Sequence, residues 1–342
     1  MSQKRVHVYV LSGFLGSGKT TLLTKAIDYF TEAGRKPAVI MNEIGEVNLD
    51  GQLIANEVPM SELLGGCICC SSRGDLATAL NELVTEQQPD LIFVESTGIA
   101  NPMEIIDEVT DASLVLPIEL SAMITVVDAP QLLELNRTSR GKTYRLMRDQ
   151  IRCANLLLLN KTDLLQEAAL QEVHDLVREW NPFADLQYTV FSQIDIKLIE
   201  DIHMEVANRE QRDGLAGNES QGQGQDHLDD EHSHEDEHHH HSHRHVMAYT
   251  HFFERAVDSH AFEEFVSKLP QEVYRAKGIL SFSDTSSRFL FQYAYREMDF
   301  VKITPKGNVP DVAVFIGENF SKDLVRTELL KLEALSDKEA IQ

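Results

Sequence analysis

The chain has 342 residues, of which 42 % are apolar, and its 31 basic and 55 acidic residues give a formal net charge of −24. A surface this acidic repels nucleic acids and anionic membranes, so neither is expected as a partner. No stretch approaches the roughly 18 unbroken apolar residues that a membrane-spanning helix needs.

Residues 1–204 are expected to form a parallel α/β domain. Short β-branched or apolar runs predict strands, and amphipathic stretches between them predict helices. Such alternation is typical of a parallel sheet with helices on both faces. The strand candidates are 6–12, 37–42, 90–96, 122–128, 155–160 and 187–191. The helix candidates lie near 19–33, 75–88, 103–109, 144–154 and 164–179.

The alternating pattern stops at about residue 205. Residues 205–246 have almost no apolar side chains and are rich in Gly, Gln, Asp, Glu and His, so we predict a disordered linker there. Residues 247–342 then predict a smaller, mostly antiparallel α+β domain. Its strand candidates are 247–257, 272–283, 288–295, 298–303 and 312–316, and its helix candidates are 259–269 and 320–335.

The segment GFLGSGKT, residues 13–20, matches the phosphate-binding pattern G-x-x-x-x-G-K-[ST] between a predicted strand and a predicted helix. Its backbone can wrap around phosphates, and the helix start adds N–H donors. Lys19 is expected to reach the β- and γ-phosphates, and the Thr20 hydroxyl to ligate Mg²⁺. The other residues assigned to nucleotide binding here are Gly13, Gly16, Ser17, Gly18 and Thr21.

The segment NKTD, Asn160–Asp163, ends another apolar run and indicates which base is bound. A carboxylate at Asp163 can accept both N–H donors of guanine, and adenine has no matching pair. With Asn160 and Lys161 beside it, this motif favours GTP over ATP. A small-molecule kinase that uses ATP is therefore the less favoured alternative.

The segment ESTG places Glu95 at a strand end, with Gly98 three residues later. We assign Glu95 a catalytic role near Mg²⁺ and Gly98 a role in sensing the γ-phosphate. A capping carboxylate is the alternative for Glu95, and Asp128 competes for the magnesium shell. No obvious catalytic glutamine follows ESTG to position the attacking water, so slow intrinsic hydrolysis is expected.

Together with NEIGEVNLDG and GGCICCSSRGDL, these motifs resemble the CobW family of P-loop GTPases, which are related to nickel-insertion GTPases. VYRAKGIL and VFIG in the second domain resemble the CobW C-terminal domain. The resemblance implies a GTP-hydrolysing metallochaperone that transfers zinc to a client apo-metalloprotein. Cobalt, iron or nickel insertion is the alternative, as is a metal-storage protein with a regulatory GTPase. The smaller domain is the expected surface for the client or for homo-oligomer formation.

Three of the four cysteines, Cys67, Cys69 and Cys70, lie within four residues. Neighbouring cysteines seldom reach disulfide geometry, so a cytoplasmic protein with metal-binding thiols fits better. Three thiolates supply most of a tetrahedral zinc shell. The candidates for the fourth ligand are Glu43 or Glu46 of NEIGE, a water, a histidine of the linker or a residue of the client protein. Buried structural thiols, or a redox pair at Cys69–Cys70, are the alternatives. The fourth cysteine, Cys153, is expected in the core.

The linker supplies a second group of candidate metal ligands. Residues 227–245 contain nine histidines. Neutral imidazole binds Zn²⁺, Ni²⁺ and Co²⁺, so this tract predicts weak metal-collecting sites, the alternative being a merely solvated linker. The consecutive ligands are His238, His239, His240 and His241.

Overall fold

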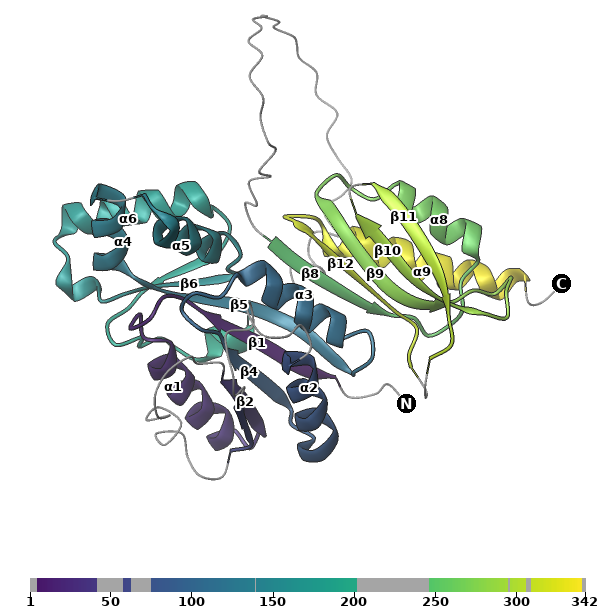
Figure 1. Cartoon of the computed structure of the whole chain (residues 1–342), viewed down its shortest axis with the longest axis horizontal. Helices are drawn as coiled ribbons and strands as arrows, with labels where there is room; N and C mark the ends of the chain where they lie inside the picture. Colours follow the sequence, from purple (N-terminus) through teal and green to yellow (C-terminus); the bar gives the residue numbers. More distant parts are fainter. Residues whose placement is uncertain are drawn as a thin grey trace, which may run out of the picture.

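A computed structural model describes the chain at residues 5–41, 58–62, 75–138, 140–201, 246–294, 296–305 and 309–339. It contains two sheets, each with its own helices (Figure 1). None of the helices in these ranges is both long and apolar enough to cross a membrane.

The larger sheet has seven strands in the order β3-β2-β4-β1-β5-β6-β7, and every pair of neighbours is parallel. This confirms the predicted fold class. The strands are β1 Val6–Ser12, β2 Pro37–Met41, β3 Met60–Glu62, β4 Leu91–Glu95, β5 Ile118–Asp128, β6 Leu156–Asn160 and β7 Asp185–Tyr188.

Helices cover both faces of this sheet. α1 packs on one face, with Leu23, Ile27 and Phe30 buried against β-strand side chains. The other face carries α2 and α3 over the β2, β4 and β1 side, and α4, α5 and α6 over the β5 and β6 side. The helices are α1 Lys19–Glu32, α2 Asp75–Glu82, α3 Pro102–Ala112, α4 Ala129–Thr138, α5 Lys142–Arg152 and α6 Glu167–Trp180.

The larger domain differs from the prediction in one predicted strand and in two elements that were not predicted, the short strand β3 and the helix α4. The last predicted strand, 187–191, ends early as β7, because Phe191 has a φ of 53° and Ser192 a φ of 51°. Such left-handed values cannot continue a strand. Helix α4 was not predicted, because its apolar pattern is short: beyond Ala129, only Leu132 and Leu133 are buried.

The smaller sheet is antiparallel, in the order β11-β10-β9-β12-β8. Helices α8 and α9 pack on one face over a phenylalanine-rich core that includes Phe262, Phe291 and Phe315. The elements are β8 Val246–Phe252, α8 Ser259–Ser267, β9 Val273–Ser281, β10 Arg288–Ala294, β11 Glu297–Ile303, β12 Val312–Glu318 and α9 Lys322–Glu339.

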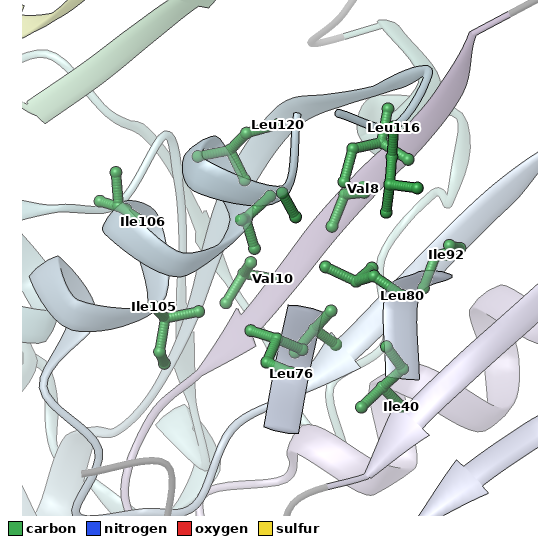
Figure 2. Close-up of a cluster of buried hydrophobic side chains, with 14 of the residues drawn as sticks. Val8, Val10, Ile40, Leu76, Leu80, Ile92, Ile105, Ile106, Leu116 and Leu120 are labelled. Atoms are coloured by element: carbon green, nitrogen blue, oxygen red, sulfur yellow. The ribbon is translucent and has the colours of Figure 1, made fainter. Parts of the chain in front are cut away.

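The other face of the smaller sheet shares a core with the larger domain. Ile279 of β9, Val314 of β12 and Val246 of β8 belong to the same buried cluster as side chains of α2, α3 and β1. Figure 2 shows part of this cluster, with Ile105 of α3 on the side of Val10 and Leu76. Apolar burial on this scale holds the two sheets together.

Candidate nucleotide site

Four strands of the larger sheet end in polar residues that lie at one edge, because neighbouring parallel strands run in the same direction. β4 ends at Glu95, β5 at Asp128 and β6 at Asn160, and β1 between β4 and β5 leads into the phosphate loop. Ligands of open parallel sheets bind at this carboxyl edge. The edge therefore brings together the motifs that the sequence analysis singled out.

The phosphate loop has the backbone geometry of a cradle. Three glycines of the loop have positive φ values that residues with a side chain rarely adopt: 132° at Gly13, 72° at Gly16 and 113° at Gly18. A Cβ atom on Gly13 would lie 2.2 Å from the carbonyl oxygen of Val126. The Ser17 N–H donates to the Phe14 carbonyl at 3.1 Å and closes the turn before α1.

Two buried polar groups inside the loop fit a phosphate ligand. The Ser17 hydroxyl has no hydrogen-bond partner among the described residues, although Ser17 is fully buried. Lys19 is also buried, and its ammonium group donates to the Phe14 carbonyl at 3.3 Å within the same loop. A buried hydroxyl and a buried cation in a glycine-rich turn are donors that a phosphate would satisfy.

Thr20 and Glu95 meet beside this loop. Leu11 of β1 is paired with Glu95 of β4, so the end of β4 lies next to the start of α1. The Thr20 hydroxyl donates to Glu95 Oε1 at 2.9 Å. A hydroxyl and a carboxylate at this distance are both oxygen ligands that suit Mg²⁺.

Gly98 packs directly on the phosphate loop. A Cβ atom at Gly98 would lie 2.6 Å from the Leu15 backbone nitrogen, so only glycine permits this approach. Behind the segment, the buried Gln150 side chain of α5 donates to the Gly98 and Ala100 carbonyls at 3.2 and 3.4 Å. Nothing in the sequence pattern predicted this role of Gln150.

Asn160 ties the NKTD segment to the phosphate loop. Its buried amide donates to the Ser17 carbonyl at 2.7 Å. Its carbonyl oxygen accepts from the Thr189 hydroxyl at 3.0 Å and from the Ser192 N–H at 2.9 Å. The base motif, the phosphate loop and the segment after β7 are therefore one hydrogen-bonded unit.

Asp163 lies in the short 3₁₀ turn Thr162–Leu164 and is exposed, as a residue that binds a base must be before the base arrives. Lys161 has a φ of 62° and forms an ion pair with Asp128. Asp128 also accepts from the Gln131 N–H at 3.0 Å at the start of α4. The Asp128 carboxylate thus binds the start of α4 and the Lys161 ammonium group rather than the Thr20–Glu95 pair.

The sequence analysis missed the segment after β7. Phe191 is 77 % exposed, and its carbonyl accepts from the Lys25 ammonium of α1 at 2.7 Å. The Ser192 hydroxyl donates to the Gly18 carbonyl at 3.0 Å. Polar residues after the last strand of a parallel sheet were the available signal, but two successive left-handed residues without glycine are not predictable from composition.

The predicted zinc ligands Cys67, Cys69, Cys70, Glu43 and Glu46 lie outside the described residues, as do His238, His239, His240 and His241. Within the described ranges no three His, Cys, Asp or Glu side chains are arranged to hold a metal ion. Cys153 is buried in the core, as predicted, and burial raises the pKa of its thiol.

Comparison with known proteins agrees with this arrangement. Residues 7–187 match the family described as CobW/HypB/UreG, nucleotide-binding domain. The chain belongs to the CobW/HypB/UreG family. Residues 246–333 match the cobalamin synthesis protein CobW C-terminal domain.

Several curated relatives are similar to about half of this chain. The Zinc-regulated GTPase metalloprotein activator 1 of Dictyostelium discoideum is 34 % identical over 230 residues, 57 % of this chain and 48 % of the relative. Zinc chaperone YeiR of Escherichia coli is 34 % identical over 155 residues, 45 % of this chain and 46 % of the relative. The matches with these two relatives thus span about half the length of each.

Among solved structures, the Zn(II)-bound YjiA GTPase from E. coli aligns at 22 % identity and a TM-score of 0.46. The alignment covers 96 % of this chain and 99 % of that one.

Proposed function

We propose that this protein hydrolyses GTP and uses the hydrolysis to deliver zinc to client apo-metalloproteins. The observation that carries the GTP part is the Asn160 amide, which joins the guanine-selecting segment to the phosphate loop. The zinc part is supported by the cysteine segment of the sequence and by the names of relatives called zinc chaperones.

In this proposal each residue of the nucleotide site has a distinct task. The phosphate-loop backbone and Lys19 hold the phosphates, and Asp163 accepts from guanine. Thr20 and Glu95 hold Mg²⁺, which supplies positive charge to the phosphates. Gly98 lies against the phosphate loop, where its N–H can respond to the γ-phosphate.

We further propose that Cys67, Cys69 and Cys70 bind zinc, with Glu43 or Glu46 as a fourth ligand. Three thiolates and one exchangeable oxygen would leave the shell open for transfer. In chain order the cysteines come before Glu95 and Gly98. The cysteines follow NEIGE and are separated from Glu95 by α2 and the rest of β4. In this proposal a metal held by NEIGE and the cysteines responds to the presence of the γ-phosphate, as loops held by γ-phosphate and Mg²⁺ do in other GTPases.

Replacing Cys67, Cys69 and Cys70 together with alanine should remove the tight zinc site and leave GDP binding intact. The reason is that no cysteine belongs to the nucleotide site described above. Zinc bound per chain, measured by metal analysis after dialysis, should fall by one equivalent. A matched Cys153→Ala variant should keep its zinc, because Cys153 is a core residue. Unchanged zinc content in the triple variant would contradict the assignment.

Deleting residues 226–245 should lower the number of weakly bound zinc ions without abolishing GTP hydrolysis. The tract holds nine histidines and follows the larger domain in sequence. Isothermal titration with zinc, together with phosphate release from GTP, would measure both effects. Loss of hydrolysis in the deletion variant would show that the tract is more than a metal-collecting linker.

The remaining assignments complete the proposal. We place the nucleotide domain at residues 1–204, the linker at 205–246 and the CobW-type domain at 247–342, in a cytoplasmic protein. Stimulation of GTP turnover by apo-client would favour delivery. Turnover that ignores every client would favour metal storage, and tighter cobalt, iron or nickel binding would favour another metal.

A further inference from the structure

Helix α3 begins where the ESTG segment ends. Asn101 caps the helix by accepting from the Met103 N–H at 3.0 Å, and Pro102 occupies the first turn. Gly98 lies three residues before this cap, against the phosphate loop. Residues 99–101 are thus the only residues between α3 and the glycine that packs on the phosphate loop.

The smaller domain holds α3 through two basic residues of β9. Arg275 Nη1 donates to Asp107 Oδ2 of α3 at 2.6 Å. Lys277 forms an ion pair with Asp111, one turn further along the helix, and donates to the Asp107 carbonyl at 3.1 Å. The Lys277 side chain is 15 % exposed and its partner Asp111 is 64 % exposed, so solvent partly screens this pair.

The two basic residues share one face of β9, and the two acidic residues share one face of α3. Residues two apart on a strand point to the same face, as Arg275 and Lys277 do. Residues four apart on a helix also share a face, as Asp107 and Asp111 do. Two ion pairs one turn apart hold α3 to β9 at two points along the helix, so they restrain pivoting about either contact, which a single pair would allow.

Apolar contacts beneath the ion pairs keep the helix and β9 together. Ile105, Ile106 and Val109 of α3 belong to the same buried cluster as Ile279 of β9 and Val314 of β12. Figure 2 shows Ile105 and Ile106 pointing into this cluster. Closely packed groups transmit a displacement rather than absorb it.

The same cluster reaches the ESTG segment by a second route. Cys153, which follows α5, belongs to this cluster, and Gln150 lies one helical turn earlier. Gln150 binds the Gly98 and Ala100 carbonyls, and its own backbone carbonyl accepts from the Thr125 hydroxyl of β5 at 3.0 Å. The segment is thus held by α3 on one side and by α5 on the other.

We propose that Arg275 and Lys277 are positioning residues for GTP hydrolysis. They act through α3 on Gly98. The position of Gly98 against the phosphate loop then depends on how the smaller domain holds α3. A client bound to the smaller domain could change the hydrolysis rate by this route. The proposal rests on the proposed GTP hydrolysis and not on the identity of the metal.

The test replaces Arg275 and Lys277 together with methionine, which keeps most of each apolar stem and removes both charges. We expect kcat for GTP to fall about fivefold, the lower end of the usual range of coupling between sites. The affinity for GDP should stay within about twofold of wild type, because the base and phosphate contacts are untouched. Phosphate release and fluorescent GDP titration would measure the two quantities in the full-length protein.

Three further variants separate positioning from general stability. Arg137→Met removes a comparable pair with Glu172, between α4 and α6, and should leave kcat unchanged. Exchanging the partners, as Asp107→Arg with Arg275→Asp, should restore much of the kcat that Arg275→Asp alone loses. This rescue would show that Arg275 acts through Asp107, and an unchanged GDP affinity together with unchanged kcat in Arg137→Met separates positioning from general stability.

The outcomes distinguish this proposal from the one that it rests on. If the wild-type protein hydrolyses GTP and the methionine variant has the same kcat, the positioning role is overturned and the proposed GTP hydrolysis is not. Loss of kcat without rescue by the exchanged pair, or with an equal loss in Arg137→Met, would also overturn it. Wild-type protein that binds GDP but never releases phosphate from GTP would overturn both proposals.

Discussion

Lys19→Ala is expected to lower kcat for GTP by about 10²–10³-fold, the usual effect of removing one preorganised charged donor. Lys19 is buried in the phosphate loop, and its ammonium group already lies within 3.3 Å of the Phe14 carbonyl. It therefore needs little rearrangement to reach a phosphate. Phosphate release at saturating GTP would measure the loss.

The fold of the Lys19→Ala protein should survive. The variant loses a hydrogen bond but also the cost of burying a cation, so its unfolding free energy without nucleotide should change by no more than about 1–2 kcal/mol. GDP at a hundredfold excess over the wild-type Kd should stabilise wild type by about 2.7 kcal/mol and the variant much less. Lys36→Ala, at an exposed site before β2, is the matched control. Full stabilisation of Lys19→Ala by GDP would contradict the assigned role.

Asn160→Ala is expected to weaken both the fold and guanine nucleotide binding. The substitution leaves the Ser17 carbonyl and the Ser192 N–H without their present partner in a buried place. Each orphaned group costs about 1–3 kcal/mol, so the unfolding free energy should fall by about 2–6 kcal/mol. Chemical denaturation with and without GDP would measure the fold and the binding together.

Asn181→Ala is a close control for this effect. Asn181 is also fully buried, and its amide donates to the Ile151 and Ala154 carbonyls at 2.8 and 3.0 Å, away from the phosphate loop. It should lose a similar free energy of unfolding and keep its affinity for GDP. Equal losses of GDP affinity in both variants would mean that Asn160 acts only through general stability.

Much of the fold could be predicted because its signals are local. The buried strands of the larger sheet are continuous apolar runs, and the phosphate loop has a glycine at each position that requires a left-handed φ. Helix α4 could not be predicted, because its few buried residues give no clear period.

The nucleotide site was predictable only in part. Thr20 and Glu95 carry recognisable motifs, and the structure places them 2.9 Å apart. Gln150 and Ser192 act through side-chain contacts between segments distant in sequence, with no motif around them. The ion pairs between β9 and α3 likewise have no motif around them. Two basic residues on a strand do not indicate which helix they will contact until the packing of the two sheets is known.

The central claim is that the nucleotide state controls the zinc site. The most direct measurement is the zinc affinity of the full-length protein, by competition with a chelator, in the presence of a non-hydrolysable GTP analogue and of GDP. We predict tighter binding with the GTP analogue by about tenfold, and loss of this difference in the triple cysteine-to-alanine variant. Equal zinc affinities in the two nucleotide states would contradict the account, because a ligand that binds both states equally cannot be released by passing between them.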